Sequence, residues 1–502
     1  MKRATLLFTM LFLASQAIAS PLRYAEDRSP AILNPLFATS MSDARIAELV
    51  FESLFTDDFE LRASPLLAES FQIASDRKSM TIELRPNVKW HDGTHFTSAD
   101  VVFTVAAMKN PETISTEKGR VAWIKEVKAA GKFTVELIFE NEEYAPQDKL
   151  HFKLLPAHAF ASSTVKRNDK FQHRPIGTGP YEVIGFNDDN SISLQAYPYY
   201  HDKTNLERLT MREVADKNYQ AKLLMYESLE ALVRVLPRDL ATLQNNRSID
   251  LYPYQTNSWW YLGFNMKDER FKENAIREAI HALIDTEELL RPIGTGDLLS
   301  GPYVKSSPYY NHDVPRRKPD HAKASTLLQE AGYKMEGHYW VKDGKILHVR
   351  LATPKNLDTA QDVVINLQAQ LQNQGIRVEP VFLDEAEWKA KVWKNRDFDL
   401  ILSQWSFDRN EDIYDQFHSE GTRNFVGYAS AEVDDLLTRA RDARDPQEKK
   451  QLMRAAHKAI ANDTPMVFLW TLDTYSALSV KVRNVVVHPF YFFTWVRAWY
   501  LR

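Results

Sequence analysis

The sequence predicts an α/β fold, because strand and helix patterns alternate along nearly the whole chain. Met80–Leu84 alternates apolar and polar residues with the period of two of a half-buried strand. Thr97 followed by Asp100 is a capping-box pattern and opens the apolar run of a predicted helix. Phe133–Phe139 then returns to the alternation of a strand.

The second half of the chain shows the same alternation. Apolar spacing predicts three helices, at Ala275–Leu290, Ala322–Ala331 and Val363–Gln374. Gly332 and Gly375 follow the last two helices and are expected to end them as C-caps. Two further strands are predicted at Arg377–Phe382 and Phe398–Leu402. Because the chain has no internal repeat and no linker rich in Pro, Gly or Ser, its domains should be joined by packed crossover segments.

Residues 1–19 have the pattern of a cleaved signal peptide: a basic start at Lys2 and Arg3, the apolar run Leu6–Leu13 and the small-residue exit Ala17–Ala19. The apolar run is too short to span a bilayer, which takes about 20 residues. The alternative is a buried N-terminal helix. We expect the mature chain to begin at Ser20. A bacterial lipoprotein needs a cysteine at that position, so we expect a lipid-free periplasmic protein.

Composition narrows the classes of function. The formal net charge of −4 becomes −6 without Lys2 and Arg3, because the first 19 residues hold no acid. Nucleic-acid binding needs a basic face, so no nucleic-acid partner is expected. No later run of about 18 apolar residues occurs, which predicts a soluble mature protein. The chain has no cysteine, and 502 residues can bury an adequate core without disulfides.

No catalytic chemistry is predicted. Gly177–Tyr181 and Gly294–Asp297 both lack the Gly-Lys-Ser/Thr ending of a phosphate-binding loop. A Gly-x-Ser-x-Gly nucleophile elbow is absent from the sequence. His91, Asp92 and His95 suggest a metal site at first sight, but the competing interpretation is a strand-to-helix turn with polar caps. We therefore expect no catalytic residue, no metal and no cofactor.

Several segments carry a resemblance to a known family. They are Pro65–Phe71, Leu84–Gly93, Phe96–Phe103, Gly177–Tyr181, Phe264–Asn265 with Ile276–Ile280, and Lys323–Tyr333. In this order they resemble the extracellular solute-binding proteins, family 5, which include the dipeptide-, oligopeptide- and nickel-binding periplasmic proteins of ABC importers. Two stretches depart from the family pattern, Ala196–Tyr200 and Tyr226–Glu230. The chain is therefore a divergent relative, and fold survives such changes more easily than ligand identity does.

The resemblance implies a two-lobed periplasmic-binding-protein fold with the ligand cleft between the lobes. Lobe I is expected to comprise residues 20–49, 176–262 and 473–502, with an inserted subdomain at residues 50–175. Lobe II is expected to comprise residues 263–472. Two crossover segments, Trp260–Phe264 and Trp470–Tyr475, are expected to form the hinge.

The function implied by the resemblance is that of the solute-binding component of an ABC importer. It would act as a monomer that binds a small-molecule ligand, expected to be a peptide, and delivers it to an inner-membrane ABC permease. The alternatives on the same fold are a binder of another small solute, such as a nickel chelate or an oligosaccharide. An enzyme or a chaperone-like module on a two-lobed scaffold is the alternative from another class.

Site residues follow from the same resemblance. Trp405-Ser406-Phe407-Asp408 resembles the stretch with which peptide-binding members engage the ligand's ammonium group, which assigns that role to Asp408. The backbone of Ser403, Gln404, Ser406 and Phe407 is expected to pair with the peptide main chain. Lys355 is expected near the ligand's carboxylate. The competing interpretations are a solvated loop acid for Asp408 and core packing for Trp405.

Overall fold

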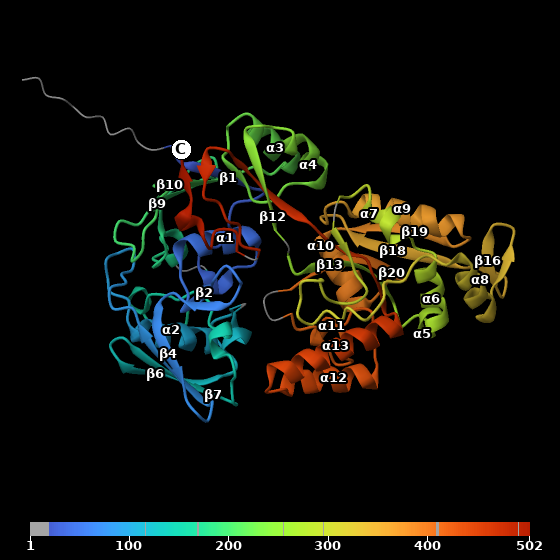
Figure 1. The fold of residues 1–502 in the computed structure, drawn as a ribbon, viewed down its shortest axis with the longest axis horizontal. Helices are drawn as coiled ribbons and strands as arrows, with labels where there is room; N and C mark the ends of the chain where they lie inside the picture. The colour runs from blue at the N-terminus through green and yellow to red at the C-terminus, as the bar shows by residue number, and fades with distance from the viewer. Residues whose placement is uncertain are drawn as a thin grey trace, which may run out of the picture.

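The computed structural model describes residues 20–115, 117–167, 170–254, 256–294, 296–407, 411–489 and 491–502. The predicted signal peptide lies outside the described residues. Two lobes stand side by side, each built around its own β-sheet and joined by extended segments (Figure 1). Among the described helices, none combines the length and the apolar character that a membrane span requires.

Lobe I holds a seven-stranded mixed sheet. Its order is β12 (Ile249–Tyr254), β23 (Thr474–Ser479), β11 (Ala231–Leu232), β1 (Leu22–Glu26), β10 (Arg208–Glu213), β9 (Ile192–Ala196) and β8 (Tyr181–Phe186). The first strand of the chain, β1, pairs in parallel with β10 and β11. The late strand β23 lies between β12 and β11 and is antiparallel to both, so the C-terminal segment returns to the lobe in which the chain begins.

A four-stranded antiparallel sheet lies beside the lobe I sheet, in the lower left of Figure 1. Its order is β4 (Ala68–Ile73), β5 (Ser79–Leu84), β7 (Thr134–Phe139) and β6 (Ile124–Gly131). The strands predicted at Met80–Leu84 and Phe133–Phe139 are confirmed as β5 and β7. The capping box is also confirmed, since Thr97 and Asp100 cap helix α2 (Ser98–Lys109) reciprocally.

Lobe II is built on a five-stranded sheet. Its order is β19 (Arg377–Leu383), β18 (His348–Pro354), β20 (Leu400–Ser406), β13 (Ser258–Phe264) and β21 (Met466–Phe468). Helices α8 (His321–Glu330) and α9 (Ala360–Asn373) confirm two of the predicted helices, and Gly332 and Gly375 adopt positive φ just after them. Strand β19 confirms the predicted extended stretch after α9.

All seven residues of β13 are buried, because this strand has a packed layer on each face. Trp260, Leu262 and Phe264 belong to the core that includes α6 (Asn274–Ala282), α8 and α9. Trp259 and Tyr261 belong to the core on the other face, with α12 (Ala431–Asp442) and α13 (Pro446–Asp463). The alternation of side chains along a strand thus divides the lobe II core into two layers.

The single helix predicted at Ala275–Leu290 is wrong. The structure has two helices, α6 (Asn274–Ala282) and α7 (Thr286–Leu290). Asp285 lies between them in an extended conformation, and its carboxylate accepts hydrogen bonds from the backbone of Glu287 and Glu288. Such an N-cap begins a new helix and so interrupts the apolar periodicity that predicted one.

The hinge predicted at Trp260–Phe264 is also wrong, because this stretch lies inside β13 and pairs with β20 and β21. The chain passes from lobe I to lobe II earlier, between Tyr254 at the end of β12 and Ser258. The second predicted crossover, Trp470–Tyr475, comprises the whole of β22 (Trp470–Leu472) and the first two residues of β23. The residue ranges given for the lobes and the inserted subdomain stay predictions.

Two of the segments that carry the family resemblance meet in space. The His91 backbone N–H donates to the Gly177 carbonyl at 2.8 Å, and the Gly177 N–H donates to His91 Nδ1 at 3.2 Å. His91 Nε2 lies 3.0 Å from the Gly179 carbonyl. Burial lowers the pKa of His91 to about 4, which keeps the ring neutral at pH 7. His91 therefore joins two backbone segments in the described structure.

Gly177 also lies against the end of α1 (Met41–Val50). A Cβ atom at position 177 would lie 1.7 Å from the Val50 carbonyl oxygen. That separation is far inside van der Waals contact, and the obstacle is backbone that cannot rotate away. Only glycine fits between α1 and the His91 turn.

We predict that Gly177→Ala lowers the free energy of unfolding by at least about 2 kcal/mol, because the added methyl group forces the backbone of α1 to move. Gly119→Ala is the matched control, since a Cβ there meets no atom within 4 Å. It should change stability by less than about 0.5 kcal/mol. Urea unfolding followed by tryptophan fluorescence measures both. Equal midpoints for the two variants would contradict the packing described here.

Candidate functional site

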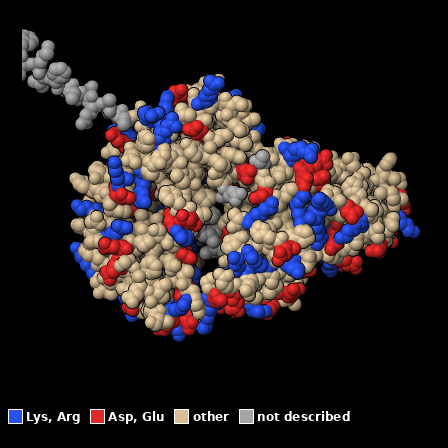
Figure 2. Space-filling model, viewed as in Figure 1, with Lys and Arg blue, Asp and Glu red and all other residues tan. Residues whose placement is uncertain are grey.

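The molecular surface is hollowed between the two lobes (Figure 2). On the lobe II side, β18 and β20 are parallel neighbours, so their C-terminal ends meet at one edge of the sheet. Strand β13 is antiparallel to β20 and begins at that same edge with Ser258, four residues after the last residue of β12 in lobe I. This edge of the lobe II sheet therefore faces lobe I.

Strand β20 is displaced from its predicted position. It begins at Leu400 and continues to Ser406, whereas the sequence predicted Phe398–Leu402. Pairing with β13 along all seven residues extends it, and the Phe407 N–H adds a further hydrogen bond to the Asn257 carbonyl at 2.8 Å. The candidate ligand-binding segment Ser403–Phe407 is thus held by hydrogen bonds to a sheet and does not lie in a free loop.

One edge of β20 remains available near its end. On the side away from β13, the described pairing with β18 covers only Leu400 and Ile401. Opposed residues in antiparallel strands alternate between bonded and non-bonded pairs, and Phe407 with Asn257 is a bonded pair. By that alternation, Gln404 and Ser406 direct their backbone N–H and C=O groups toward the edge that β18 leaves unpaired.

Trp405 lies in a stack of aromatic rings. Its ring is parallel to that of Tyr261, with centroids 6.1 Å apart, and to that of Phe425 at 5.6 Å. Phe425 stacks in turn on Trp393, whose side chain is 49% exposed. Burial raises the pKa of Tyr261, while a hydrogen bond from Ser403 lowers it. The stack runs from the core of lobe II to its surface.

The position of Trp405 is compatible with both interpretations given for it, core packing and ligand contact. It packs against the core, and it is nevertheless half-buried at the cleft edge. Its Nε1 is buried and has no hydrogen-bond acceptor among the described residues.

The other predicted residues lie at the same edge. Ser403 is buried, Gln404 and Phe407 are half-buried, and Ser406 is exposed with its hydroxyl 2.8 Å from that of Ser258. Lys355 follows β18, is exposed, and donates its backbone N–H to the Leu383 carbonyl at 2.8 Å. Asp408 lies outside the described residues. The ligand contacts of all these residues stay predictions.

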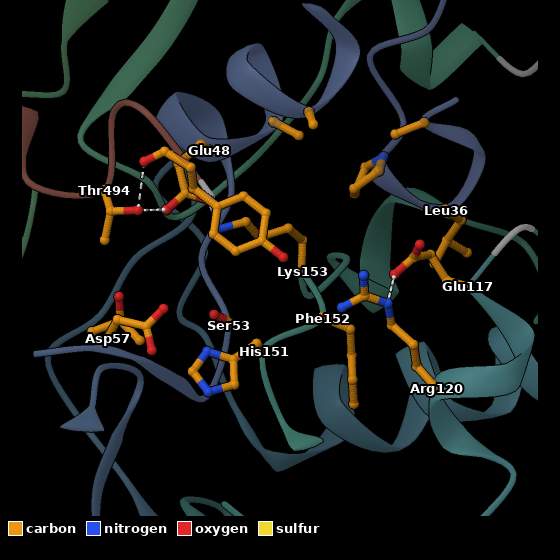
Figure 3. A pocket seen from close by; sticks show the side chains of 16 residues that line it. Leu36, Glu48, Ser53, Asp57, Glu117, Arg120, His151, Phe152, Lys153 and Thr494 are labelled. Carbon is orange, nitrogen blue, oxygen red and sulfur yellow. Dashed lines mark hydrogen bonds and ion pairs between the residues drawn. The ribbon is translucent and has the colours of Figure 1, made fainter. Parts of the chain in front are cut away.

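The sequence did not reveal a pocket in lobe I (Figure 3). It has a volume of about 100 Å³ and lies between α1, strand β2 (Phe55–Asp57), residues 151–153 and the C-terminal segment. Its charged and polar lining comprises Glu48, Ser53, Thr56, Asp57, Glu117, Arg120, His151, Lys153, Tyr491 and Thr494.

Charges in the lobe I pocket are paired. Lys153 Nζ lies 2.5 Å from Glu48, and Arg120 lies 2.7 Å from Glu117. The Thr494 hydroxyl donates to Glu48 at 3.0 Å. Such a set of opposite charges suits a ligand that carries both signs. No single stretch of sequence contains these residues, so no local pattern could have identified the pocket.

Ion pairs join the two lobes at two places. Asp358, which follows β18, lies 3.5 Å from Lys217 of α3 (Lys217–Met225) and 3.6 Å from Arg234, both in lobe I. Arg444, between α12 and α13, lies 3.1 Å from Glu142, which follows β7. The residue after Asp358, Thr359, has a φ of +65°, which is rare for a β-branched residue and shows that the turn is held by its surroundings.

Comparison with known proteins decides the family. The profile of the "Bacterial extracellular solute-binding proteins, family 5 Middle" matches residues 62–425, more than half of the chain. The chain belongs to this family. Two relatives support this family assignment. The oligopeptide-binding protein AppA of Bacillus subtilis is 26% identical over 92% of this chain and 88% of AppA. The glutathione-binding protein GsiB of Pectobacterium atrosepticum is 26% identical over 94% of each chain.

Solved structures of this solute-binding family share the fold. AppA of Bacillus subtilis in complex with a nonapeptide matches with a TM-score of 0.80 at 24% identity, over 96% of this chain and 99% of that one. NikZ of Campylobacter jejuni in complex with Ni(L-His) matches with a TM-score of 0.81 at 24% identity and the same coverage. The two-lobed α/β fold implied by the sequence resemblance is thus confirmed.

We predict that Asp358→Asn shifts the ligand-free protein toward a more open arrangement of the lobes, because Lys217 and Arg234 lose their partner across the cleft. Exposed ion pairs contribute up to about 1 kcal/mol, so the population shift should be at most about fivefold. The chain has no cysteine, so Lys128→Cys and Lys345→Cys allow dyes to be placed on the two lobes for energy transfer.

The matched control is Asp362→Asn, an exposed acid one turn into α9 that should leave the lobe separation unchanged. High salt should reduce the difference between Asp358→Asn and the wild type. Identical energy transfer for the two proteins at low salt would show that Asp358 does not hold the lobes together.

Proposed function

We propose that the protein binds a peptide between its lobes and delivers it to the permease of an ABC importer. The observation that carries this proposal is the partly unpaired edge of β20 at the cleft. AppA is named for oligopeptide binding and GsiB for glutathione binding, and the solved AppA holds a nonapeptide, which supports a peptide as the ligand class.

A peptide main chain matches this edge chemically. It presents alternating N–H and C=O groups with the spacing of a strand, and Gln404 and Ser406 present the complementary groups. These backbone contacts are independent of the ligand's side chains, so they suit a binder of varied peptides. Trp405 is half-buried and joins through Phe425 to the exposed Trp393, and this aromatic stack would supply apolar contacts for ligand side chains.

Charged residues complete the proposed site. Asp408 follows β20 in sequence and would receive the ligand's ammonium group, while Lys355 would receive the carboxylate. Closure expels water, and a charge enclosed without a partner is strongly disfavoured. The opposite charges of the lobe I pocket, such as Arg120 and Glu48, would serve a zwitterionic ligand in the same way.

A nickel chelate is the second candidate ligand. The solved NikZ holds Ni(L-His), and its fold matches this chain as well as that of AppA does. Arg120 and Lys153 in the lobe I pocket could donate hydrogen bonds to the carboxylates of such a chelate. Native mass spectrometry of the purified protein distinguishes the two, because a nickel complex and a peptide differ in mass and isotope pattern.

The cellular setting is part of the same proposal. The protein would act in the periplasm as a lipid-free monomer that starts at Ser20, and it would bind its ligand without transforming it. N-terminal sequencing of periplasmic extract tests the processing. Retention of Met1, or recovery in the membrane fraction, would contradict it.

We predict that Ser406→Pro weakens binding of a tetrapeptide at least tenfold, because proline removes the backbone donor that faces the ligand edge. The pairing of β20 with β13 should survive, since the Ser406 N–H points away from β13. Ser406→Ala is the control: it loses the hydroxyl contact with Ser258 but keeps the backbone donor, so its affinity should stay close to that of the wild type. Titration calorimetry measures all three, and equal affinities would refute strand pairing.

We predict that Asp408→Ala weakens peptide binding by about 2–5 kcal/mol, because a buried ammonium would lose its counter-charge. Asp408→Asn keeps the shape and should lose a large part of the same affinity. Asp442→Ala, an exposed acid of α12, is the control. N-acetylated peptides should bind the wild type poorly and discriminate less between it and Asp408→Ala. Equal affinity for free and N-acetylated peptides would move the assignment to a ligand that has no ammonium group.

A further inference from the structure

A second cavity lies in lobe II, away from the cleft edge. Its volume is about 100 Å³, and it is enclosed by α6, α7, the segment from Leu299 to Arg317, the end of α13 and the edge strand β21. Met466 lines it and lies opposite Gly263, which in turn lies opposite Ile401. Phe468, which also lines the cavity, lies at the level of Ser403, so roughly 10 to 17 Å of strand separates the cavity from the end of β20 at the cleft edge.

The ionisable side chains that line this cavity are all of basic type. They are His281, Arg316 and Arg317, and no carboxylate is among the lining residues that the structure describes. Arg316 donates to Glu287, and Arg317 lies 3.7 Å from Glu278, but both glutamates lie outside the lining. Arg317 also donates to the Thr464 hydroxyl and to the Ala461 carbonyl, both at 2.9 Å, so the described lining of the cavity itself carries no negative charge.

His281 provides an independent sign that a ligand is missing. Its Nδ1 is buried and has no hydrogen-bond partner among the described residues. A buried polar atom without a partner costs about 1–3 kcal/mol, so such atoms are uncommon in folded proteins. Burial, with further contributions from Arg317 and Lys323, lowers the pKa of His281 to about 3, which keeps the ring neutral at pH 7.

The remaining walls determine what kind of anion fits. Leu299, Val314, Met466 and Phe468 are the apolar residues of the lining, and Thr286 and Ser300 are its hydroxyl-bearing residues. The volume equals that of a few water molecules, which leaves room for only a few heavy atoms. A lining that combines apolar side chains with two guanidinium groups suits a short carbon chain that ends in a carboxylate.

We propose that this lobe II cavity binds a small aliphatic carboxylate of two or three carbons. The carboxylate would accept hydrogen bonds from Arg316, Arg317 and the imidazole of His281, and its carbons would face Met466 and Phe468. The site is separate from the proposed peptide site, so the protein would respond to a small organic anion through a lobe II surface that the peptide does not occupy.

The test uses the full mature protein and sodium propionate, followed by saturation-transfer NMR of the propionate signals and by the imidazole resonances of the protein. Propionate should bind saturably, and propylammonium, which has a similar size and the opposite charge, should not. Arg316→Gln should weaken propionate binding at least tenfold. Arg291→Gln is the matched control, because it removes an exposed arginine at the end of α7 that does not line the cavity, and it should change binding less than twofold.

Two further variants make the result decisive. His281→Phe keeps a ring in the cavity wall and removes its nitrogens, so it should also weaken binding if it folds with the wild-type unfolding midpoint. Ser406→Pro should bind propionate as the wild type does, which separates this site from the peptide site. The proposal is overturned if propionate fails to saturate the wild type, if Arg316→Gln binds as tightly as Arg291→Gln, or if Ser406→Pro loses propionate together with peptide.

Discussion

The antiparallel pairing of β13 with β20 is the interaction on which the candidate site and the crossover between the lobes both depend. It runs from Phe264 opposite Leu400 to Ser258 opposite Ser406, and Asn257 continues it to Phe407. Asn257 lies in the segment by which the chain enters lobe II, and Phe407 lies in the candidate ligand segment. One ladder of hydrogen bonds therefore connects the point where the lobes join to the point where the ligand is proposed to bind. A rotation between the lobes acts directly on the strand that carries the site.

Local patterns in the sequence predicted the elements whose causes are local. The strands β5 and β7 and the capping box at Thr97 follow from alternation and from side-chain chemistry within a few residues. The helix predicted at Ala275–Leu290 failed because Asp285 can either continue a polar helix face or cap a new helix, and only the packed structure selects the cap. The predicted end of β20 was wrong for a similar reason. The strand extends to Ser406 because it pairs with residues nearly 150 positions earlier in the chain.

The candidate site also combines features that the sequence predicted with features that depend on tertiary packing. The resemblance identified Ser403–Phe407 and Lys355, and the structure brings both to one edge of the sheet. The resemblance gave no information about which edge of β20 is unpaired, because that depends on how many residues of β18 pair with β20. The lobe I pocket could not be predicted from the sequence, because α1, Arg120 and Thr494 approach one another only in the folded chain. The segments that carry the family resemblance were informative because some of them contact one another in the folded chain, as the hydrogen bond between His91 and Gly177 shows.

The position of β23 sets an order of assembly. This strand comes from residues 474–479, yet it lies between β12 and β11 in the interior of the lobe I sheet. Lobe I begins with the first described strand of the chain and cannot close its sheet until nearly the last residues are available. The five strands of the main lobe II sheet all lie between residues 258 and 468, so lobe II can complete this sheet first. During synthesis, the lobe that starts the chain is therefore the last to complete its sheet, and loss of a C-terminal piece that includes β23 would separate β12 from the rest of that sheet.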